Sequence, residues 1–196
     1  MQLDIPPGPF AGYIFDLDGT LIDSMPVHYR AWDAAMHQFG LREPLDENFF
    51  YSLGGVPTLR VAALIAERYG LQADPQAVFH VKEQIFVDLL SHAPLIEPTV
   101  AFLRSVAATT PCAVASGGPR AIVHHSLRLS GLAGYFRAIV TADDVVHGKP
   151  APDMFLLAAS ILHVPAGQCL VFEDAEPGMR AARAAGMQVV HVPSRQ

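Results

Sequence analysis

Short apolar runs, most of them separated by helical patterns, constrain the fold of this chain more than any other feature. Each run is four residues long and suits a buried β-strand. We expect strands over residues 12–15, 112–115, 138–141, 169–172 and 189–192. Because strands that alternate with helices form parallel sheets covered on both faces, the pattern predicts a doubly wound parallel α/β sheet.

Every polar cluster of interest directly follows one of the first four predicted strands. These clusters are Asp16 with Asp18, Ser116–Gly118, Asp143–Asp144 and Glu173–Asp174. In open parallel sheets, ligands bind at the carboxyl ends of the strands. We therefore expect these polar residues to gather in a single site.

Asp16 and Asp18 are two carboxylates at the end of the first apolar run. Residues two apart in an extended strand point to the same face, so these side chains can converge. Gly19 permits a tight turn, and Thr20 adds a hydroxyl. Because adjacent carboxylates repel each other unless a cation or a proton lies between them, the pair favours a hard metal such as Mg²⁺ and a shared phosphate. Two acids near a turn can also form a solvated loop.

The segment Phe15–Leu21 contains Asp-x-Asp-Gly-Thr-Leu behind a strand and resembles motif I of the haloacid dehalogenase superfamily. Three further segments resemble later motifs of that superfamily in the same order: Ser116–Gly117, His147–Asp153 and Val171–Ala175. The resemblance covers nearly the whole chain. It implies a Rossmann-like α/β core with an inserted α-helical cap domain, and the phosphotransferase type of activity that most members share.

The resemblance also implies roles for individual residues. Asp16 would attack phosphorus and form an aspartyl phosphate, and Asp18 would act first as general acid and then as general base. Lys149 would lie beside the nucleophile, and Ser116 with Gly117 would form a cradle for the phosphate. Ser116 can also cap the helix that follows, and the two interpretations are compatible.

The metal that the resemblance implies is Mg²⁺, which takes about six oxygen ligands. Asp16, the backbone carbonyl of Asp18 and the carboxylate of Asp174 would bind it. Glu173 would bind it directly or through water. Dehalogenases of the superfamily lack the second aspartate and need no metal, so Asp18 separates this chain from them.

The segment 23–94 shows helical patterns and no convincing strand. We expect helices over residues 27–39, 58–69 and 75–90. Because this insert follows the first strand, we expect a helical cap domain over residues 23–94. Residues 1–22 and 95–196 would then form the catalytic core.

Within the superfamily, the segment Asp23–Trp32 resembles the β-phosphoglucomutase-like group. In that group a histidine on the first cap helix reaches toward the acid/base aspartate, and His28 matches it. Lys82 falls near a cap lysine that faces substrate in the group. Both residues are implied to bind substrate, and the alternatives are a surface histidine and a solvated helix lysine.

One departure from the sugar phosphomutases bears on the reaction. Those enzymes hold the non-transferring phosphate with an arginine in the cap loop, whereas Thr58 occupies that position here. Arg60 lies two residues further on, well around the helix. The chain looks most similar to bacterial phosphatases acting on fructose 1-phosphate and 6-phosphogluconate. We therefore expect hydrolysis of a small sugar-phosphate monoester, with a phosphomutase of the same architecture as the alternative.

Other classes of function fit the chain less well. A non-catalytic phosphate-sensing module would be expected to lack one of four residues that are all present: Asp16, Asp18, Lys149 and Asp174. The formal net charge is −6 and basic residues are scattered, so we expect no nucleic-acid partner. The longest uncharged run, 154–172, is interrupted by polar residues, so we expect no membrane span. The expected partner is a small phosphorylated metabolite.

Two further features bear on the cellular setting. The N-terminal residues lack a basic region followed by an apolar run, so we expect no signal peptide. Cys112 and Cys169 both open apolar runs. They could pair, but we expect buried free thiols in a reducing cytoplasm. We also expect the chain to act as a monomer.

Overall fold

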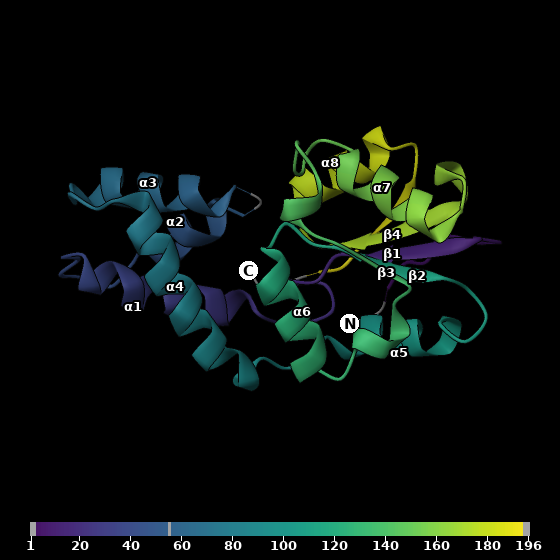
Figure 1. The fold of residues 1–196 in the computed structure, drawn as a ribbon, viewed down its shortest axis with the longest axis horizontal. Coiled ribbons are helices and arrows are strands. Elements are labelled where there is room, and N and C mark those ends of the chain that lie inside the picture. Colours follow the sequence, from purple (N-terminus) through teal and green to yellow (C-terminus); the bar gives the residue numbers. More distant parts are fainter. Residues whose placement is uncertain (1–2, 55, 194–196) are drawn as a thin grey trace. The chain divides into compact units, whose positions relative to one another are not determined.

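The computed structural model describes residues 3–54 and 56–193, and a five-stranded parallel sheet forms its centre. The strands are β1 (Gly12–Phe15), β2 (Cys112–Ala115), β3 (Ala138–Val140), β4 (Cys169–Glu173) and β5 (Gln188–His191). Their order across the sheet is β3-β2-β1-β4-β5, so the first strand lies in the middle (Figure 1). The predicted parallel α/β architecture is confirmed.

Some strand boundaries differ by one residue from those expected. β3 ends at Val140 because Thr141 caps a short 3-10 helix, η3 (Ala142–Asp144). The backbone N–H and the hydroxyl of Thr141 both donate to the carboxylate of Asp144, at 2.8 and 2.7 Å. β4 extends one residue further than expected and includes Glu173. An ionisable side chain therefore lies within the sheet.

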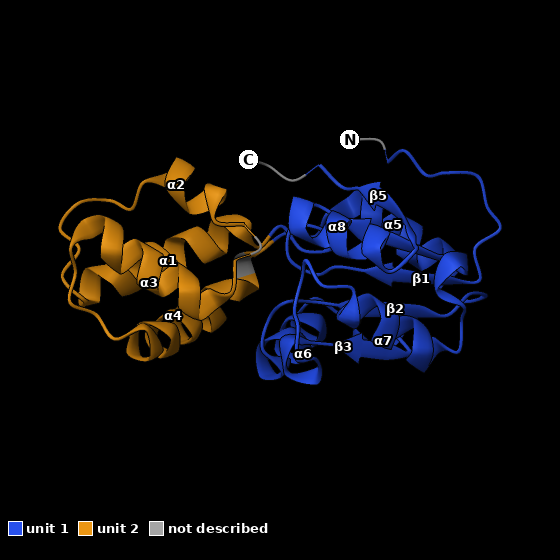
Figure 2. Ribbon diagram, turned by 90° about the horizontal axis from the view of Figure 1, so that it is seen from above, with its two compact units in different colours: residues 1–23, 94–195 blue, residues 24–93, 196 orange. Residues whose placement is uncertain are grey.

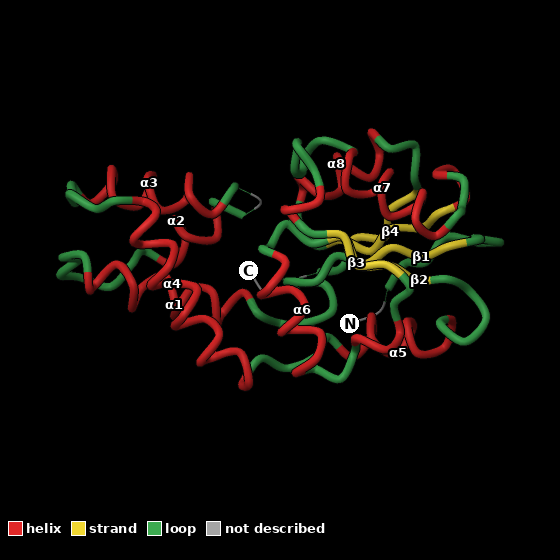
Figure 3. The backbone as a smooth tube through the Cα atoms, in the orientation of Figure 1, coloured by secondary structure: helices red, strands yellow, loops and turns green. Residues whose placement is uncertain are grey.

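Helices cover both faces of the sheet. They are α5 (Glu97–Val106), α6 (Arg120–Leu129), α7 (Asp153–Leu162) and α8 (Glu176–Ala184), and the connections include the 3-10 helices η2 (Ala133–Tyr135) and η4 (Ala166–Gln168). In Figures 1 and 3, α7 and α8 lie on one face of the sheet, and α5 and α6 lie on the other. Strands β2 and β4 are buried along their whole length, as expected for parallel strands that helices cover on both sides.

Side chains of β1 alternate between these two faces. Ile14 packs in one core with Phe155 and Ala158 of α7. The ring of Phe15 stacks on the ring of Phe172 in β4, with centroids 4.8 Å apart. The last two residues of β1 are thus anchored in apolar surroundings. This anchoring fixes the position of Asp16, the residue that follows the strand.

The chain forms two compact units, residues 1–23 with 94–195 and residues 24–93 (Figure 2). The first unit contains the sheet. The outermost residues of the expected core, 1–2 and 194–196, lie outside the described residues. That the second unit acts as a cap stays a prediction.

The described helices and loops of the second unit include no named strand. It contains α1 (Met25–Gln38), α2 (Glu47–Ser52), α3 (Thr58–Tyr69), α4 (Pro75–Leu89) and the 3-10 helix η1 (Leu90–His92). The sequence did not predict α2, a six-residue helix whose first turn is capped by Asp46 accepting from the backbone N–H of Phe49 at 3.0 Å. Trp32, Phe50 and Ile65 belong to a separate apolar core within this unit.

Two smaller expectations can be compared with the structure. Cys112 and Cys169 are free and buried, and burial raises the pKa of their thiols to about 12 and about 11. Across residues 3–54 and 56–193, none of the helices has the length and apolar character needed to cross a membrane.

Candidate active site

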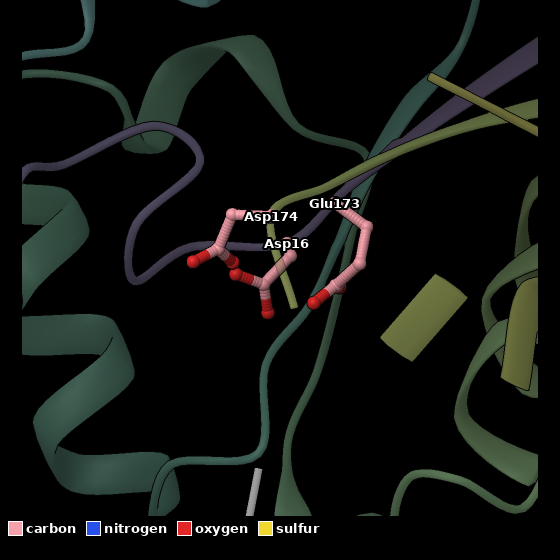
Figure 4. Close-up of side chains that lie close together, drawn as sticks. All are labelled: Asp16, Glu173 and Asp174. Atoms are coloured by element: carbon pink, nitrogen blue, oxygen red, sulfur yellow. The ribbon is translucent and has the colours of Figure 1, made fainter. Parts of the chain in front are cut away.

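Asp16, Glu173 and Asp174 come together at the carboxyl ends of two neighbouring strands. Asp16 follows β1 directly and Glu173 ends β4, and these strands pair with Phe15 opposite Phe172. The backbone N–H of Asp16 donates to the carbonyl of Phe172 at 3.0 Å, so the strand pairing continues into the site. One oxygen from each of the three carboxylates lies within 4.8 Å of the other two (Figure 4).

Lys149 contacts two of these carboxylates. Its Nζ atom donates to Oδ1 of Asp16 at 2.6 Å and to Oε2 of Glu173 at 2.7 Å. The side chain of Lys149 is 10% exposed, and those of Asp16 and Glu173 are 8% and 3% exposed. Both ion pairs are therefore shielded from water. The sequence predicted a lysine beside Asp16 but gave no sign of its contact with Glu173.

The three carboxyl groups hold protons more tightly than ordinary carboxyl groups do. Burial raises the pKa of Asp16, and the ammonium of Lys149 partly opposes this rise. Burial and then repulsion from Asp16 raise the pKa of Glu173 to about 8 and that of Asp174 to about 7. Burial by itself would lower the pKa of Lys149, but the charges of Asp16 and Glu173 outweigh it and raise this pKa. When all three carboxyl groups are ionised, the cluster carries more negative charge than the ammonium of Lys149 balances.

Two glycines make room for the acidic side chains. A Cβ atom at Gly19 would collide with the carboxylate of Asp174, and the φ of Gly19 is +82°, a backbone conformation that favours glycine. A Cβ atom at Gly178, in α8, would collide with the carboxylate of Glu173. The space beside Gly178 is therefore occupied by an acidic side chain.

Asp18 lies half-buried in the turn that follows β1. Its negative charge contributes to the raised pKa of both Asp16 and Asp174, so its carboxylate lies within electrostatic reach of the cluster. It is not among the three carboxylates that approach within 4.8 Å of one another. In the same turn, the hydroxyl of Thr20 donates to Oδ1 of Asp174 at 3.4 Å.

Ser116 lies at the end of β2, the other neighbour of β1, and is 1% exposed. Its Oγ atom accepts from the backbone N–H of Gly118 at 3.1 Å. The expectation that Ser116 caps the next helix is wrong, because Pro119 holds the N-cap position of α6. Gly117 is exposed in the loop between them.

His28 and Lys82 lie in the second unit, where both line a pocket of about 120 Å³. His28 on α1 and Phe86 on α4 stack with ring centroids 4.0 Å apart and planes 6° from parallel. Lys82 is 2% exposed, so the alternative of a solvated helix lysine is wrong. Thr58 also lines the pocket, and the rest of the described lining is apolar except for the backbone of a glycine.

Sequence reasoning missed Glu83, whose carboxylate pairs with Lys82 at 2.8 Å. A spacing signal was present for part of this arrangement, because His28 and Trp32 on α1, and Lys82 and Phe86 on α4, are each four residues apart. Such pairs share one face of a helix. Glu83 is adjacent to Lys82 in the chain, and neighbouring helix residues do not face each other, so spacing could not reveal this contact.

The first unit's site suits chemistry on an anionic group. It combines a buried carboxylate next to an ammonium, a group of acids able to hold a hard cation, and a hydroxyl on the neighbouring strand. These groups come from four segments far apart in the sequence, and the parallel sheet brings them to one edge.

Residues 10–186 match the family model described as haloacid dehalogenase-like hydrolase. The match covers most of the chain, and the chain therefore belongs to this family of hydrolases. The fold described above agrees with this family.

Individual relatives are similar over nearly the full length. The chain is 42% identical over 183 residues to fructose-1-phosphate phosphatase YqaB of Escherichia coli, covering 93% of this chain and 96% of the relative. It is 29% identical over 182 residues to the phosphorylated carbohydrates phosphatase of Thermotoga maritima, covering 91% and 82%. A solved structure of β-phosphoglucomutase from Clostridium difficile superposes with a TM-score of 0.79 and 26% identity, covering 92% and 83%.

Proposed function

We propose that this protein is a Mg²⁺-dependent phosphatase that hydrolyses a small sugar-phosphate monoester of the fructose 1-phosphate or 6-phosphogluconate type. The observation that carries the proposal is the meeting of Asp16, Lys149, Glu173 and Asp174 at the end of the central strands. The relatives named as fructose-1-phosphate and phosphorylated-carbohydrate phosphatases support the choice of substrate class.

The acidic cluster fits a divalent cation. Three carboxylates approach one another within 4.8 Å against a single ammonium, and their mutual repulsion contributes to their raised pKa values. Oxygen ligands of this kind suit Mg²⁺. Asp16, Asp174 and the backbone carbonyl of Asp18 would hold the ion, with Glu173 beside them. When bound, it would neutralise charge on the phosphate oxygens and on the carboxylates around them.

In the proposed mechanism, Asp16 attacks phosphorus in line and forms an aspartyl phosphate, which water then hydrolyses. Lys149 holds Asp16 through a 2.6 Å hydrogen bond and offers positive charge to the equatorial oxygens of the transferring group. Glu173 accepts from Lys149 and also from the backbone N–H of Ala175 at 3.3 Å, so it orients the ammonium. The hydroxyl of Ser116 and the backbone of Gly117 would bind the remaining phosphate oxygens.

Asp18 is the proposed acid and base. It would donate a proton to the leaving alkoxide in the first step and would remove a proton from the attacking water in the second. Asp18 lies close enough to Asp16 and Asp174 for its charge to raise the pKa of both, which places it beside the proposed nucleophile.

We propose that the helical unit acts as the cap and binds the sugar through His28 and Lys82. Its pocket is small beside the roughly 300–1,000 Å³ typical of drug-sized ligands, which supports a small substrate part. Thr58 lines the pocket, whereas Arg60 is exposed and is not among the described residues that line it. The lack of an arginine there supports hydrolysis over mutase chemistry, which would need to hold a second phosphate.

The proposal is tested by measuring phosphate release from fructose 1-phosphate with Mg²⁺ and with a chelator. We expect release only with Mg²⁺. Asp16→Asn should lower it by about 10³-fold or more while the melting temperature stays near that of the wild type. Asp4→Asn, the same change at an exposed position in the same unit, should have no effect.

A coupled assay separates the phosphatase from the phosphomutase. Formation of glucose 6-phosphate from β-glucose 1-phosphate without release of phosphate would show a mutase. Near-normal phosphate release by the Asp16→Asn protein would overturn the assigned nucleophile.

A further inference from the structure

Lys82 and Glu83 form a buried ion pair in the helical unit. Their charged atoms lie 2.8 Å apart, and their side chains are 2% and 12% exposed. Consecutive residues of a helix point in different directions, so two long side chains must bend toward each other to make this contact. Lys82 is one of only two lysines in the chain, and both are buried against carboxylates.

The carboxylate of Glu83 contacts the ammonium of Lys82 through one of its two oxygens. Its Oε1 atom accepts from the ammonium, and its Oε2 atom is buried without a hydrogen-bond partner among the described residues. Buried acceptors without partners are rare in proteins, so this arrangement calls for an explanation. Trp32 and Phe86 surround the ammonium with aromatic rings, whose centroids lie 5.7 and 4.7 Å from Nζ. These faces favour a cation but carry no net charge.

Lys82 lines the small pocket of the second unit, whereas Glu83 does not belong to its lining. Lys82 and His28 are the only basic residues in the described lining. A molecule in the pocket therefore meets the ammonium of Lys82, whose charge is balanced by the carboxylate of Glu83 to which it is hydrogen-bonded. The remaining walls, formed largely by apolar side chains such as Trp32 and Phe50, suit the C–H surface of a carbohydrate.

We propose that Glu83 is a positioning residue that sets substrate specificity: by balancing and orienting Lys82, it makes the pocket accept an uncharged polyhydroxy group and disfavour a second anionic group. This inference rests on the proposed function, in which the pocket takes the part of the substrate that is not transferred. It narrows the substrate class to phosphate monoesters of neutral sugars or polyols.

The physical reason lies in the two charges that an anionic group would meet. A carboxylate or second phosphate near Lys82 would also lie near Glu83, so attraction and repulsion largely cancel while the cost of leaving water remains. A sugar hydroxyl accepts a hydrogen bond from an ammonium without bringing a charge into the pocket. Like charges placed together in an interface cost enough to change specificity by about tenfold or more.

The test compares kcat/KM for fructose 1-phosphate and 6-phosphogluconate in the full-length protein. These substrates carry one phosphate each, and only the second also carries a carboxylate. We expect the wild type to prefer fructose 1-phosphate. Glu83→Gln keeps the size of the side chain and removes its charge, and it should shift the ratio toward 6-phosphogluconate by about tenfold or more. Glu67→Gln removes the same charge at an exposed position of the same unit and should leave the ratio unchanged.

Each outcome decides the inference. If Glu83 only stabilises the buried lysine, Glu83→Gln lowers both activities alike and the ratio stays within about twofold, which overturns the inference but not the proposed function. If the variant does not fold, the wild-type ratio decides, because equal or better use of 6-phosphogluconate contradicts a balanced pocket. If the wild type hydrolyses neither substrate, the proposed function fails and the inference fails with it.

Discussion

Replacing Lys149 with methionine removes the only ammonium among the described groups of the acidic cluster and keeps a side chain of similar length. Two hydrogen bonds are lost, at 2.6 Å to Asp16 and 2.7 Å to Glu173. Both partners are nearly buried, at 8% and 3% exposure, so each is left without its main source of compensation. Removing one partner of a buried ion pair destabilises a protein by about 3–5 kcal/mol.

This cost depends on pH, and the sign follows from the pKa shifts. The pKa of Glu173 is already raised to about 8, and that of Asp16 is also raised. Lys149 lowers both, so its loss raises them further. Groups with a raised folded-state pKa bind more protons when folded, so the variant loses stability relative to the wild type as pH rises. Because Glu173 of the wild type ionises as pH rises through about 8, the full cost should appear only above that value, near about pH 9 or higher, and much less should remain near about pH 5.

The assay is thermal unfolding in the presence of a chelator at these two pH values. For a chain of this size, about 1 kcal/mol corresponds to roughly 2–4 °C, so we expect a fall of about 6–20 °C near about pH 9. Arg104→Met is the matched control, because Arg104 pairs with Glu97 at 3.6 Å in an exposed ion pair. Such pairs contribute about 1 kcal/mol or less. A fall below about 2 °C for the Lys149 variant, or an equal fall at both pH values, would refute this reasoning.

Three further predictions test neighbouring parts of the account. The pKa values of Glu173 and Asp174 are raised to about 8 and about 7, so the metal-free wild type should lose stability as pH rises from about 4 to about 8. In thermal melts, Mg²⁺ should flatten this dependence on pH. A flat profile without metal would contradict the prediction. Gly178→Ala should force Glu173 to move, lowering the free energy of unfolding by about 1–3 kcal/mol along with phosphate release, whereas unchanged values of both would count against the packing described. Thr58→Arg should strengthen binding of β-glucose 1,6-bisphosphate in a competition assay, and unchanged affinity would argue against the proposed role of the pocket.

The fold could be predicted largely from local patterns. β1 and α3 begin and end where the sequence indicates, because apolar runs and the left-handed Gly70 at the end of α3 mark them clearly. α2 was missed because six residues are too few to show a helical period, and its cap depends on Asp46. β3 ends one residue earlier than expected because Thr141 donates hydrogen bonds to the side chain of Asp144. Strand propensity does not describe such a contact.

The meeting of residues from distant segments followed from one rule about parallel sheets. Asp16, Glu173 and Asp174 were expected together because each follows, or ends, a strand whose carboxyl end lies at the same edge. The sequence could not show which carboxylates Lys149 contacts, because only folding brings Glu173 next to Lys149. The burial of Lys82 was likewise hidden, because it depends on a tertiary contact with the ring of Trp32 on α1.

The central claim is that Asp16 carries the phosphoryl group during turnover. The most direct measurement is mass spectrometry of peptides from protein that has been acid-quenched during turnover of fructose 1-phosphate with Mg²⁺. We predict one added phosphoryl group on the peptide that contains Asp16, and its loss when the chelator replaces Mg²⁺. A phosphoryl group found on any other residue would contradict the account.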